Sequence, residues 1–173
     1  IDNLSSILEN GLIPVSMQQK MKIHSVHNDE QRIDSKLDCT SCSISFPNYK
    51  LLYTFREYKF PESSWVVIVL DKDVLFSPSN ITYFCQTNAA GVFPRISSAK
   101  ELCTATAFEN MFCNSLTTKE NKVIQRASLQ INDCITTDPQ AEILISDVID
   151  KKYIGCICFQ KQSDIDEYIT KYG

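Results

Sequence analysis

Pro139-Gln-Ala-Glu-Ile-Leu-Ile-Ser146 is the stretch that says most about the fold, and it follows the turn signature Thr136-Thr-Asp-Pro139. Its branched apolar residues after a proline predict a buried strand over residues 141–146. Glu142 stands near the start of that strand, where an ionised carboxylate carries a desolvation cost unless it is paired, faces a cleft or takes up a proton. Glu142 is therefore a candidate site residue. The alternative is a strand-end glutamate that faces water.

Further strands and helices on the N-terminal and C-terminal sides of this stretch predict a mixed fold. Apolar runs and alternating patterns predict strands over residues 39–46, 65–70, 81–85 and 153–159, of which 65–70 reads as a buried strand. Amphipathic patterns predict helices over residues 2–11, 49–58, 99–112, 118–130 and 163–172, with a loop over residues 18–38. Because these elements do not follow a regular strand–helix–strand order, the sequence favours an α+β fold over a doubly wound parallel sheet.

The composition is that of one globular domain spanning residues 1–173. Hydrophobic residues make up 43% of the chain and charged residues 22%, so a single core suffices at this length. No apolar run approaches the roughly 18 residues that cross a bilayer, and neither a P-loop nor a GxGxxG motif occurs. The eight cysteines are interpreted as thiols, because Cys39-Thr-Ser-Cys42 has no second pair at zinc-ligand spacing. We expect no metal site and no membrane span.

A localised basic stripe stands out in a chain of net charge −4. That acidic balance argues against non-specific binding of duplex DNA, which needs a broad basic surface. Lys119, Lys122 and Arg126 nevertheless fall at i, i+3 and i+7, so on a helix they would share one face. These three residues are candidates for contact with DNA. The alternative is a solvated helix face.

Two other places in the chain carry candidate functional groups. Arg32 lies in a polar loop, and its planar guanidinium suits a phosphate or carboxylate. Phe46-Pro-Asn-Tyr49 places two aromatic rings at a strand-to-helix turn, where a flat ligand could stack on them or where they could pack in the core. His24 and His27 lack partners at ligand spacing and are interpreted as loop residues.

Several segments together resemble one family, the DarT-type DNA ADP-ribosyltransferase toxins. The matching segments are Ile1-Asp-Asn-Leu-Ser-Ser-Ile-Leu-Glu-Asn-Gly-Leu12, Ser43-Ile-Ser-Phe-Pro-Asn-Tyr-Lys50, Asn88-Ala-Ala90 and Pro139-Gln-Ala-Glu-Ile-Leu-Ile145. They occur in the family's order and cover most of the chain. One departure is that the family has a His-x-Thr-His stretch immediately upstream of the position of Ile1. From this we expect that N-terminal residues of the natural domain are missing here.

The resemblance implies an ADP-ribosyltransferase-like fold, with two splayed β-sheets around an NAD cleft and helices outside. It implies that Glu142 and Arg32 are catalytic. The residues that it places around NAD are Asn3, Ser6, Ile13, Ser45 and Tyr49. The SISFPNYK form resembles the branch that modifies guanine more than the branch that modifies thymine.

The resemblance also implies an activity and a set of partners. The activity is mono-ADP-ribosylation of a base in single-stranded DNA, with NAD as substrate and no metal. The partners are single-stranded DNA and a macrodomain-type antitoxin that removes the ADP-ribose, and the toxin is expected to be a monomer in the bacterial cytoplasm. The alternatives are a protein-directed ADP-ribosyltransferase and a non-enzymatic nucleotide-binding module.

Overall fold

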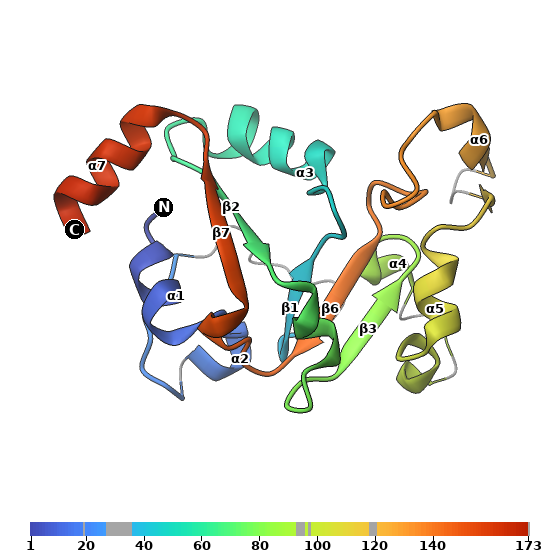
Figure 1. The fold of residues 1–173 in the computed structure, drawn as a ribbon, viewed down its shortest axis with the longest axis horizontal. Helices are drawn as coiled ribbons and strands as arrows, with labels where there is room; N and C mark the ends of the chain where they lie inside the picture. Colours follow the sequence, from blue (N-terminus) through green and yellow to red (C-terminus); the bar gives the residue numbers. More distant parts are fainter. Residues whose placement is uncertain (19, 27–35, 93–95, 97, 118–120, 173) are drawn as a thin grey trace.

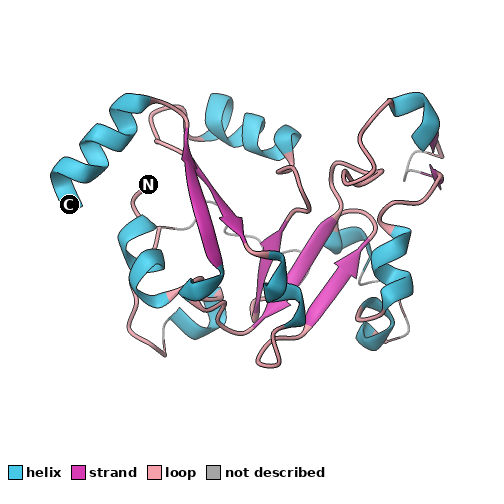
Figure 2. Cartoon of the chain, in the orientation of Figure 1, coloured by secondary structure: helices cyan, strands magenta, loops and turns pink. Residues whose placement is uncertain are grey.

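The computed structural model describes residues 1–18, 20–26, 36–92, 96, 98–117 and 121–172. Helices and strands mix along the chain, and the described strands form three separate antiparallel sheets (Figures 1 and 2). This arrangement confirms the predicted α+β class. Arg32, His27 and Lys119 lie outside the described residues.

The central sheet contains β1 (Cys39–Cys42), β6 (Glu142–Ser146) and β3 (Thr82–Cys85), with β6 in the middle. Because β6 is paired on both edges, its backbone donors and acceptors are satisfied within the sheet. Its side chains alternate between two faces, and both faces are covered. This explains why the strand is apolar from Ile143 to Ile145.

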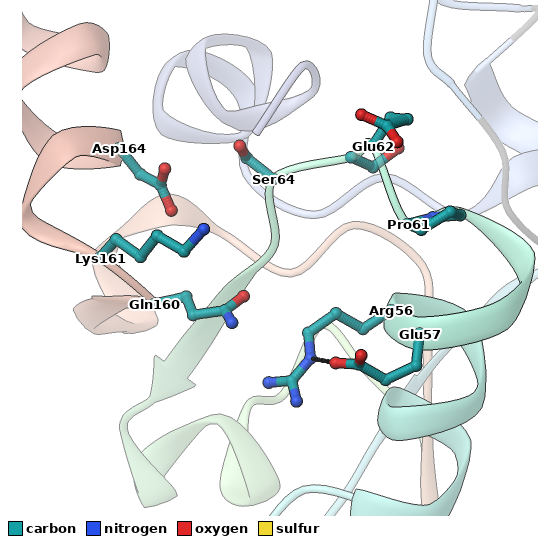
Figure 3. A pocket seen from close by; sticks show the side chains of 9 residues that line it. Arg56, Glu57, Pro61, Glu62, Ser64, Gln160, Lys161 and Asp164 are labelled. Atoms are coloured by element: carbon teal, nitrogen blue, oxygen red, sulfur yellow. Dashed lines mark hydrogen bonds and ion pairs between the residues drawn. The ribbon is translucent and has the colours of Figure 1, made fainter.

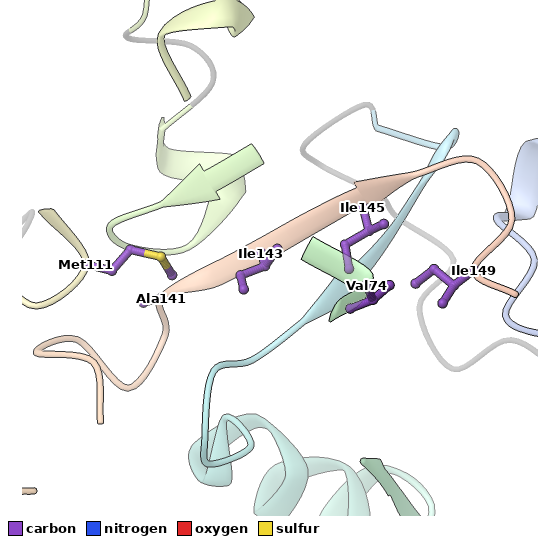
Figure 4. Close-up of a cluster of buried hydrophobic side chains, with 6 residues drawn as sticks. All are labelled: Val74, Met111, Ala141, Ile143, Ile145 and Ile149. Atoms are coloured by element: carbon purple, nitrogen blue, oxygen red, sulfur yellow. The ribbon is translucent and has the colours of Figure 1, made fainter. Parts of the chain in front are cut away.

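Two clusters of buried side chains form the core, one on each face of β6. The cluster in Figure 4 contains Val74, Met111, Ala141, Ile143, Ile145 and Ile149. The opposite cluster contains Cys39, Cys85, Ala89, Leu102 and Leu144. The predicted buried strand over residues 141–146 is therefore confirmed, and β6 is the element around which the protein is packed.

The second sheet pairs β2 (Val66–Leu70) with β7 (Ile154–Phe159), and its register shifts between Val69 and Leu70. The apolar run over residues 65–70 is a strand, as predicted, but it is not fully buried. Val69 is 42% exposed, because a two-stranded sheet leaves each strand one edge without a neighbour and covers its faces incompletely. The third sheet is the hairpin of β4 (Ser115–Thr117) and β5 (Val123–Gln125).

The first helix, α1 (Leu4–Asn10), ends at Gly11 as predicted. Gly11 has a φ of +82°, and a Cβ at this position would collide with the backbone oxygen of Ile149. Glycine is therefore required both by the backbone conformation and by the close approach of the two segments. The close approach allows Leu12 and Ile149 to form an isolated antiparallel bridge.

The remaining described elements are short, apart from the last helix. They are α2 (Val15–Gln18), α3 (Tyr49–Thr54), the π-helical turn η1 (Phe55–Lys59), η2 (Lys72–Phe76), α4 (Ala89–Val92), η4 (Ala99–Leu102), α5 (Ala105–Asn110), α6 (Arg126–Leu129), η5 (Lys151–Tyr153) and α7 (Gln162–Tyr172). The helices expected over residues 49–58 and 163–172 are confirmed by α3 with η1 and by α7. No helix among the described residues is long and apolar enough to cross a membrane.

Three sequence-based predictions of secondary structure were wrong. The helix expected over residues 118–130 is replaced by the end of the β4–β5 hairpin and by α6, with Asn121 at a φ of 60°. The helix expected over residues 99–112 is interrupted at Thr104, whose hydroxyl caps α5 by accepting from the N–H of Ala107. The strand expected over residues 39–46 stops at Cys42, because Ser45 has a φ of 59°.

Candidate functional site

The register of the central sheet gathers three distant segments at one end. Cys85, the last residue of β3, pairs with Glu142, the first residue of β6, and Cys42, the last residue of β1, pairs with the residue after Glu142. Since β1 and β3 are antiparallel to β6, the chain leaves both of them at the end where β6 begins. Residues 43–49 and residues 86–90 therefore start from the same end of the sheet as Glu142.

The carboxylate of Glu142 is held by two donors from the segment that follows β3. Asn88 donates its side-chain amide to Oε1 of Glu142 over 3.0 Å, and the backbone N–H of Ala89 donates to Oε2 over 3.0 Å. Glu142 is partly buried rather than fully exposed. The two hydrogen bonds compensate the desolvation of the carboxylate and fix its orientation. This arrangement differs from a strand-end glutamate that only faces water.

Asn88 is itself positioned by its own backbone. Its side-chain oxygen accepts from the N–H of Ala90 over 3.1 Å, at the start of α4. The side-chain amide of Asn88 therefore links the start of α4 to Glu142, with its oxygen bonded to the helix and its nitrogen bonded to the carboxylate. Asn88-Ala-Ala90 carried part of the family resemblance, yet its contact with Glu142 could not be seen in the sequence. The available signal was an asparagine directly before a short helix, which is a common capping residue.

The segment after β1 is a tight, well-bonded turn. The N–H of Phe46 donates to the carbonyl of Ile44 over 2.6 Å, across Ser45. The backbone N–H of Asn48 donates to the hydroxyl of Ser43 over 3.2 Å, and the Asn48 side chain then caps α3. A non-glycine residue with positive φ is uncommon and costs conformational energy. Ser45, which the resemblance placed beside NAD, is therefore the strained residue of this turn.

The rings of Phe46 and Tyr49 lie outside the core. Their exposed fractions are 56% and 51%, and their centroids are 6.5 Å apart with the planes tilted by 59°. Core packing, the alternative that the sequence left open, is wrong for these two rings. Both have accessible surface on which a flat group can stack.

Arg126 braces the loop that leads into β6. Its guanidinium donates to the carbonyls of Ile135, Asn132 and Asp133 over 2.8, 3.1 and 3.2 Å, and to the hydroxyl of Thr137 over 3.1 Å. It also lies 5.9 Å from the ring centroid of Phe112. Arginine is suited to this role because it presents several donors in one rigid plane. The guanidinium holds residues 132–137 together shortly before Glu142.

The basic stripe predicted on a helix does not exist as a helix face. Lys122 lies in the turn between β4 and β5, and Arg126 is the first residue of α6. The prediction that the three basic residues share one helix face rested on their spacing alone, and the spacing did not establish that a helix forms. Arg126 is hydrogen-bonded to the loop of residues 132–137, and its contact with DNA stays a prediction.

Asn3, Ser6 and Ile13 lie away from the start of β6. Asn3 and Ser6 are at the N-terminal end of α1, which lies on the far side of the β2–β7 pair from β6 in Figure 1. The Asn3 side chain does not cap α1, because it exchanges two 2.8 Å hydrogen bonds with the backbone of Val26. The carbonyl of Ile13 accepts from the side chain of Gln18 over 2.8 Å. The role of these three residues around NAD stays a prediction.

Asn3 lines a cavity of about 250 Å³ between α1 and β2. The side chains around it include Ile7, Val26, Phe60 and Trp65. The indole Nε1 of Trp65 is buried without a hydrogen-bond partner among the described residues. An unpaired buried donor is costly.

Two other cavities are lined mainly by polar side chains. The larger, of about 430 Å³, lies between η1 and the start of α7, and Figure 3 shows Arg56 and Lys161 projecting into it. Nε of Arg56 is 2.7 Å from a carboxylate oxygen of Glu57, and Glu62 and Asp164 also line the cavity. A cavity of about 360 Å³ lies beside Asn80. Glu142 lines none of these three described cavities.

Cysteines and histidines give no sign of a metal centre in the described part of the chain. All eight cysteines are free thiols, and no group of three or more His, Cys, Asp or Glu is placed to hold an ion. Desolvation by burial raises the pKa of Cys42 from 9.0 to about 12. Cys42 is therefore a neutral thiol at neutral pH.

Comparison with protein-family models identifies a relationship along the whole chain. The model described as ssDNA thymidine ADP-ribosyltransferase, DarT, matches residues 1–173. The chain belongs to the DarT family. No curated protein matches it. Membership of the DarT family makes the chain an ADP-ribosyltransferase of the kind that acts on single-stranded DNA.

The DarT assignment confirms the family resemblance read from the sequence, but only at the level of the family. The description of the matched model names thymidine, whereas the SISFPNYK form predicted the guanine-modifying branch. The match does not separate the two branches. The several small sheets are consistent with the fold of the DarT family, while the splay of two sheets around an NAD cleft stays a prediction.

Proposed function

We propose that this chain transfers ADP-ribose from NAD to a base in single-stranded DNA and that Glu142 is its catalytic carboxylate. The observation that carries the proposal is the clamped position of Glu142. Its side chain is fixed by Asn88 and Ala89 at one end of the central sheet. The segment that leads to the exposed ring of Tyr49 leaves the sheet at the same end. A fixed carboxylate suits a cationic sugar, and accessible aromatic surface suits a flat leaving group.

The chemistry that this carboxylate would support is the substitution at C1′ of the nicotinamide ribose. The bond between C1′ and the nicotinamide nitrogen breaks, and nicotinamide leaves with the electron pair. The sugar passes through an oxocarbenium-like state, which a nearby carboxylate stabilises, as in glycoside hydrolysis. A nitrogen of the DNA base forms the new bond to C1′ and releases its proton to Glu142.

Arg32 is proposed to contact the phosphates of NAD or to assist the proton transfer. Asn3, Ser6, Ile13, Ser45 and Tyr49 are proposed to line the NAD site. Among these, Tyr49 has the most direct support, since half of its surface is exposed next to the turn that starts at Ser43. Substitution of Arg32 by alanine should lower transfer to DNA.

Lys122 is proposed to contact the DNA backbone together with Lys119. Lys122 is exposed and directly precedes β5, and cations near phosphates strengthen binding in a salt-dependent way. Lys122→Glu should therefore weaken modification of an oligonucleotide while the affinity for NAD stays the same. Unchanged modification would exclude this surface.

The next experiment distinguishes between the two candidate acceptor bases, thymine and guanine. The family description supports thymidine, while the SISFPNYK segment supports guanine. Oligonucleotides that contain a single guanine or a single thymine should be incubated with NAD and analysed by mass spectrometry. A mass increase of one ADP-ribose on one of them identifies the base, and modification of a protein acceptor alone would overturn the proposal.

The catalytic role of Glu142 is tested by Glu142→Gln, which keeps the size of the side chain and removes its charge. The variant should lose transfer, whereas Glu109→Gln, at an exposed position in α5, should not. A Glu142→Gln protein with wild-type transfer would remove the basis of the mechanism.

The biological setting follows from the same proposal. We propose that the chain acts as the toxin of a toxin–antitoxin pair, as a monomer in the bacterial cytoplasm. Its antitoxin would be a macrodomain-type protein that removes ADP-ribose from the base. Expression in bacteria should be toxic with the wild-type chain and harmless with Glu142→Gln, and co-expression of such a hydrolase should restore growth.

A further inference from the structure

Four aromatic side chains form a strip along the outer side of α3 and η1. They are Phe46, Tyr49, Tyr53 and Tyr58, which we call the aromatic strip. Their exposed fractions are 56%, 51%, 51% and 72%. Large aromatic side chains usually bury most of their surface in a core or an interface. Four of them exposed in succession therefore indicate a binding surface.

The rings follow one another along the helix. The centroids of Phe46 and Tyr49 are 6.5 Å apart, and those of Tyr53 and Tyr58 are 5.8 Å apart. Tyr49 and Tyr53 are four residues apart on α3, so their side chains lie on the same side of the helix. The π-helical turn of η1 brings Tyr58 back to that side, because it adds a residue to the turn.

The opposite side of the same helix provides the anchor. Phe55 stacks on Trp65 with centroids 6.1 Å apart and an interplanar angle of 15°, and Phe60 packs against both rings. The helix therefore has its own apolar contact with the protein. The aromatic strip is not needed for that contact.

One exposed cation accompanies the aromatic strip. Residues 43–60 contain the cations Lys50, Arg56 and Lys59 and the single anion Glu57. Arg56 is paired with Glu57 over 2.7 Å, and Nζ of Lys59 lies 4.9 Å from the ring centroid of Phe55, on the anchored side of the helix. Lys50 follows Tyr49 in α3 and is exposed. Accessible rings with a cation nearby can bind single-stranded nucleic acid, with bases on the rings and a phosphate near the cation.

The phenol group of Tyr53, towards the far end of the aromatic strip, is neutral. A hydrogen bond with Tyr58 raises the pKa of Tyr53 above its usual value, and the proximity of Tyr58 acts in the same direction. Since the pKa of an ordinary tyrosine is already about 10, the ring of Tyr53 carries no negative charge at neutral pH. No phenolate at this position would repel a phosphate.

We propose that the far end of the aromatic strip binds nucleotides that flank the acceptor base, with Tyr53 and Tyr58 each stacking on a base, while Tyr49 keeps its proposed place beside NAD. The inference rests on the proposed transfer to single-stranded DNA. The strip begins in the turn after β1, at the same end of the central sheet as Glu142, and leads away from it along α3. A strand that places one base near Glu142 would therefore have its neighbouring bases over Tyr53 and Tyr58.

The test compares long and short DNA acceptors in variants that remove the rings. The variant Tyr53→Leu/Tyr58→Leu keeps apolar side chains without aromatic faces. We expect the KM for an oligonucleotide of about 12 nucleotides to rise roughly tenfold or more, with kcat and the DNA-independent hydrolysis of NAD unchanged. The KM for a single nucleotide that carries the acceptor base should stay the same, because it has no neighbouring base to stack on the two rings.

Two further variants serve as controls. Tyr58→Phe keeps the ring and should retain the wild-type KM for the long oligonucleotide. Phe76→Leu removes an aromatic side chain that is 80% exposed in η2, outside the aromatic strip, and should also retain it. Photo-crosslinking with an oligonucleotide that carries 5-iodouracil next to the acceptor base should label Tyr53 or Tyr58.

The outcomes separate this inference from the proposed function. Equal KM values for the double leucine variant and Phe76→Leu on the long oligonucleotide, while the wild type transfers ADP-ribose to it, overturn the role of the aromatic strip alone. A double variant that leaves KM unchanged but converts a self-associated protein into a monomer overturns it in favour of a contact between two copies. A wild-type chain that transfers ADP-ribose to no oligonucleotide overturns the proposed function itself.

Discussion

Asn88 donates its side-chain amide to Oε1 of Glu142 over 3.0 Å, although the two residues are 54 positions apart in the chain. The contact links the segment after β3 to the first residue of β6. Because the backbone N–H of Ala89 holds the other carboxylate oxygen, the orientation of Glu142 depends on this segment. Asn88 therefore has the position of a residue that orients a carboxylate without needing to touch a substrate.

Asn88→Ala is expected to lower kcat more than it raises KM. Loss of the amide leaves Glu142 held by Ala89 from one side, and small displacements of a reacting group cost up to about 100-fold in rate. Steady-state kinetics with a saturating oligonucleotide and varied NAD would show whether kcat or KM changes more. Asn88→Asp should be at least as impaired, since it places a second carboxylate 3.0 Å from the first. Wild-type kcat in Asn88→Ala would contradict the orienting role.

Arg126→Lys is expected to behave like Arg126→Met. Lysine keeps the charge but cannot reproduce the four hydrogen bonds to residues 132–137. Both variants should lower the free energy of unfolding by about 2 to 4 kcal/mol, measured by urea denaturation, and both should slow transfer. Recovery of activity by lysine alone would instead favour a contact of the positive charge with DNA.

Gly11→Ala is expected to be strongly destabilising, and Gly155→Ala is its matched control. Alanine at Gly11 needs a φ of +82° and meets the backbone of Ile149, whereas a Cβ at Gly155 would lie at an ordinary 3.5 Å from the oxygen of Val69. The conformational cost at Gly11 alone is about 1 to 3 kcal/mol, before the bridge to Ile149 is broken. Thermal unfolding of the two variants would measure the difference. Similar melting temperatures would contradict this role of Gly11.

Cys42 is expected to resist alkylation at pH 8 in the folded protein, while the exposed Cys134 reacts. Burial raises the pKa of Cys42 from 9.0 to about 12, so its reactive thiolate is scarce. Mass spectrometry after treatment with iodoacetamide would map the modified thiols, before and after unfolding in urea. Rapid labelling of Cys42 in the folded state would contradict the effect of burial.

The same shift predicts a dependence of stability on pH. Between pH 9 and pH 12 the unfolded thiol of Cys42 releases its proton and the folded one retains it. The stabilisation is therefore complete below pH 9 and is lost as the pH rises towards 12. The difference in unfolding free energy between the wild type and Cys42→Ala should shrink or reverse over this range. A constant difference would rule out a contribution from Cys42.

Local patterns predicted the elements whose side chains are buried in one consistent way. Residues 141–146 were recognised because Ile143, Leu144 and Ile145 are all covered, and α1 was recognised from its stripe and from Gly11. The helix predicted over residues 118–130 was wrong because the pattern of polar and aliphatic residues there is compatible with a helix and equally with a hairpin. Only the pairing of β4 with β5 distinguishes the two.

The candidate site was predictable in its residue types and not in its contacts. Glu142 was identified from a charge in an apolar strand, and Tyr49 from an aromatic group at a turn. The clamp by Asn88 and the bracing by Arg126 depend on which strands are neighbours, and that information is non-local. The resemblance supplied the segments, whereas the register of the central sheet explains why three of them start from one place.

The strand order β1-β6-β3 also sets when activity can arise during synthesis. Both neighbours of β6 leave the ribosome long before it does, and they remain unpaired with each other until residues 142–146 insert between them. A nascent chain that lacks this last central strand has neither the carboxylate nor the platform that holds it. With Glu142 in its proposed catalytic role, no active form exists before residues 142–146 have been made and have paired with both neighbours.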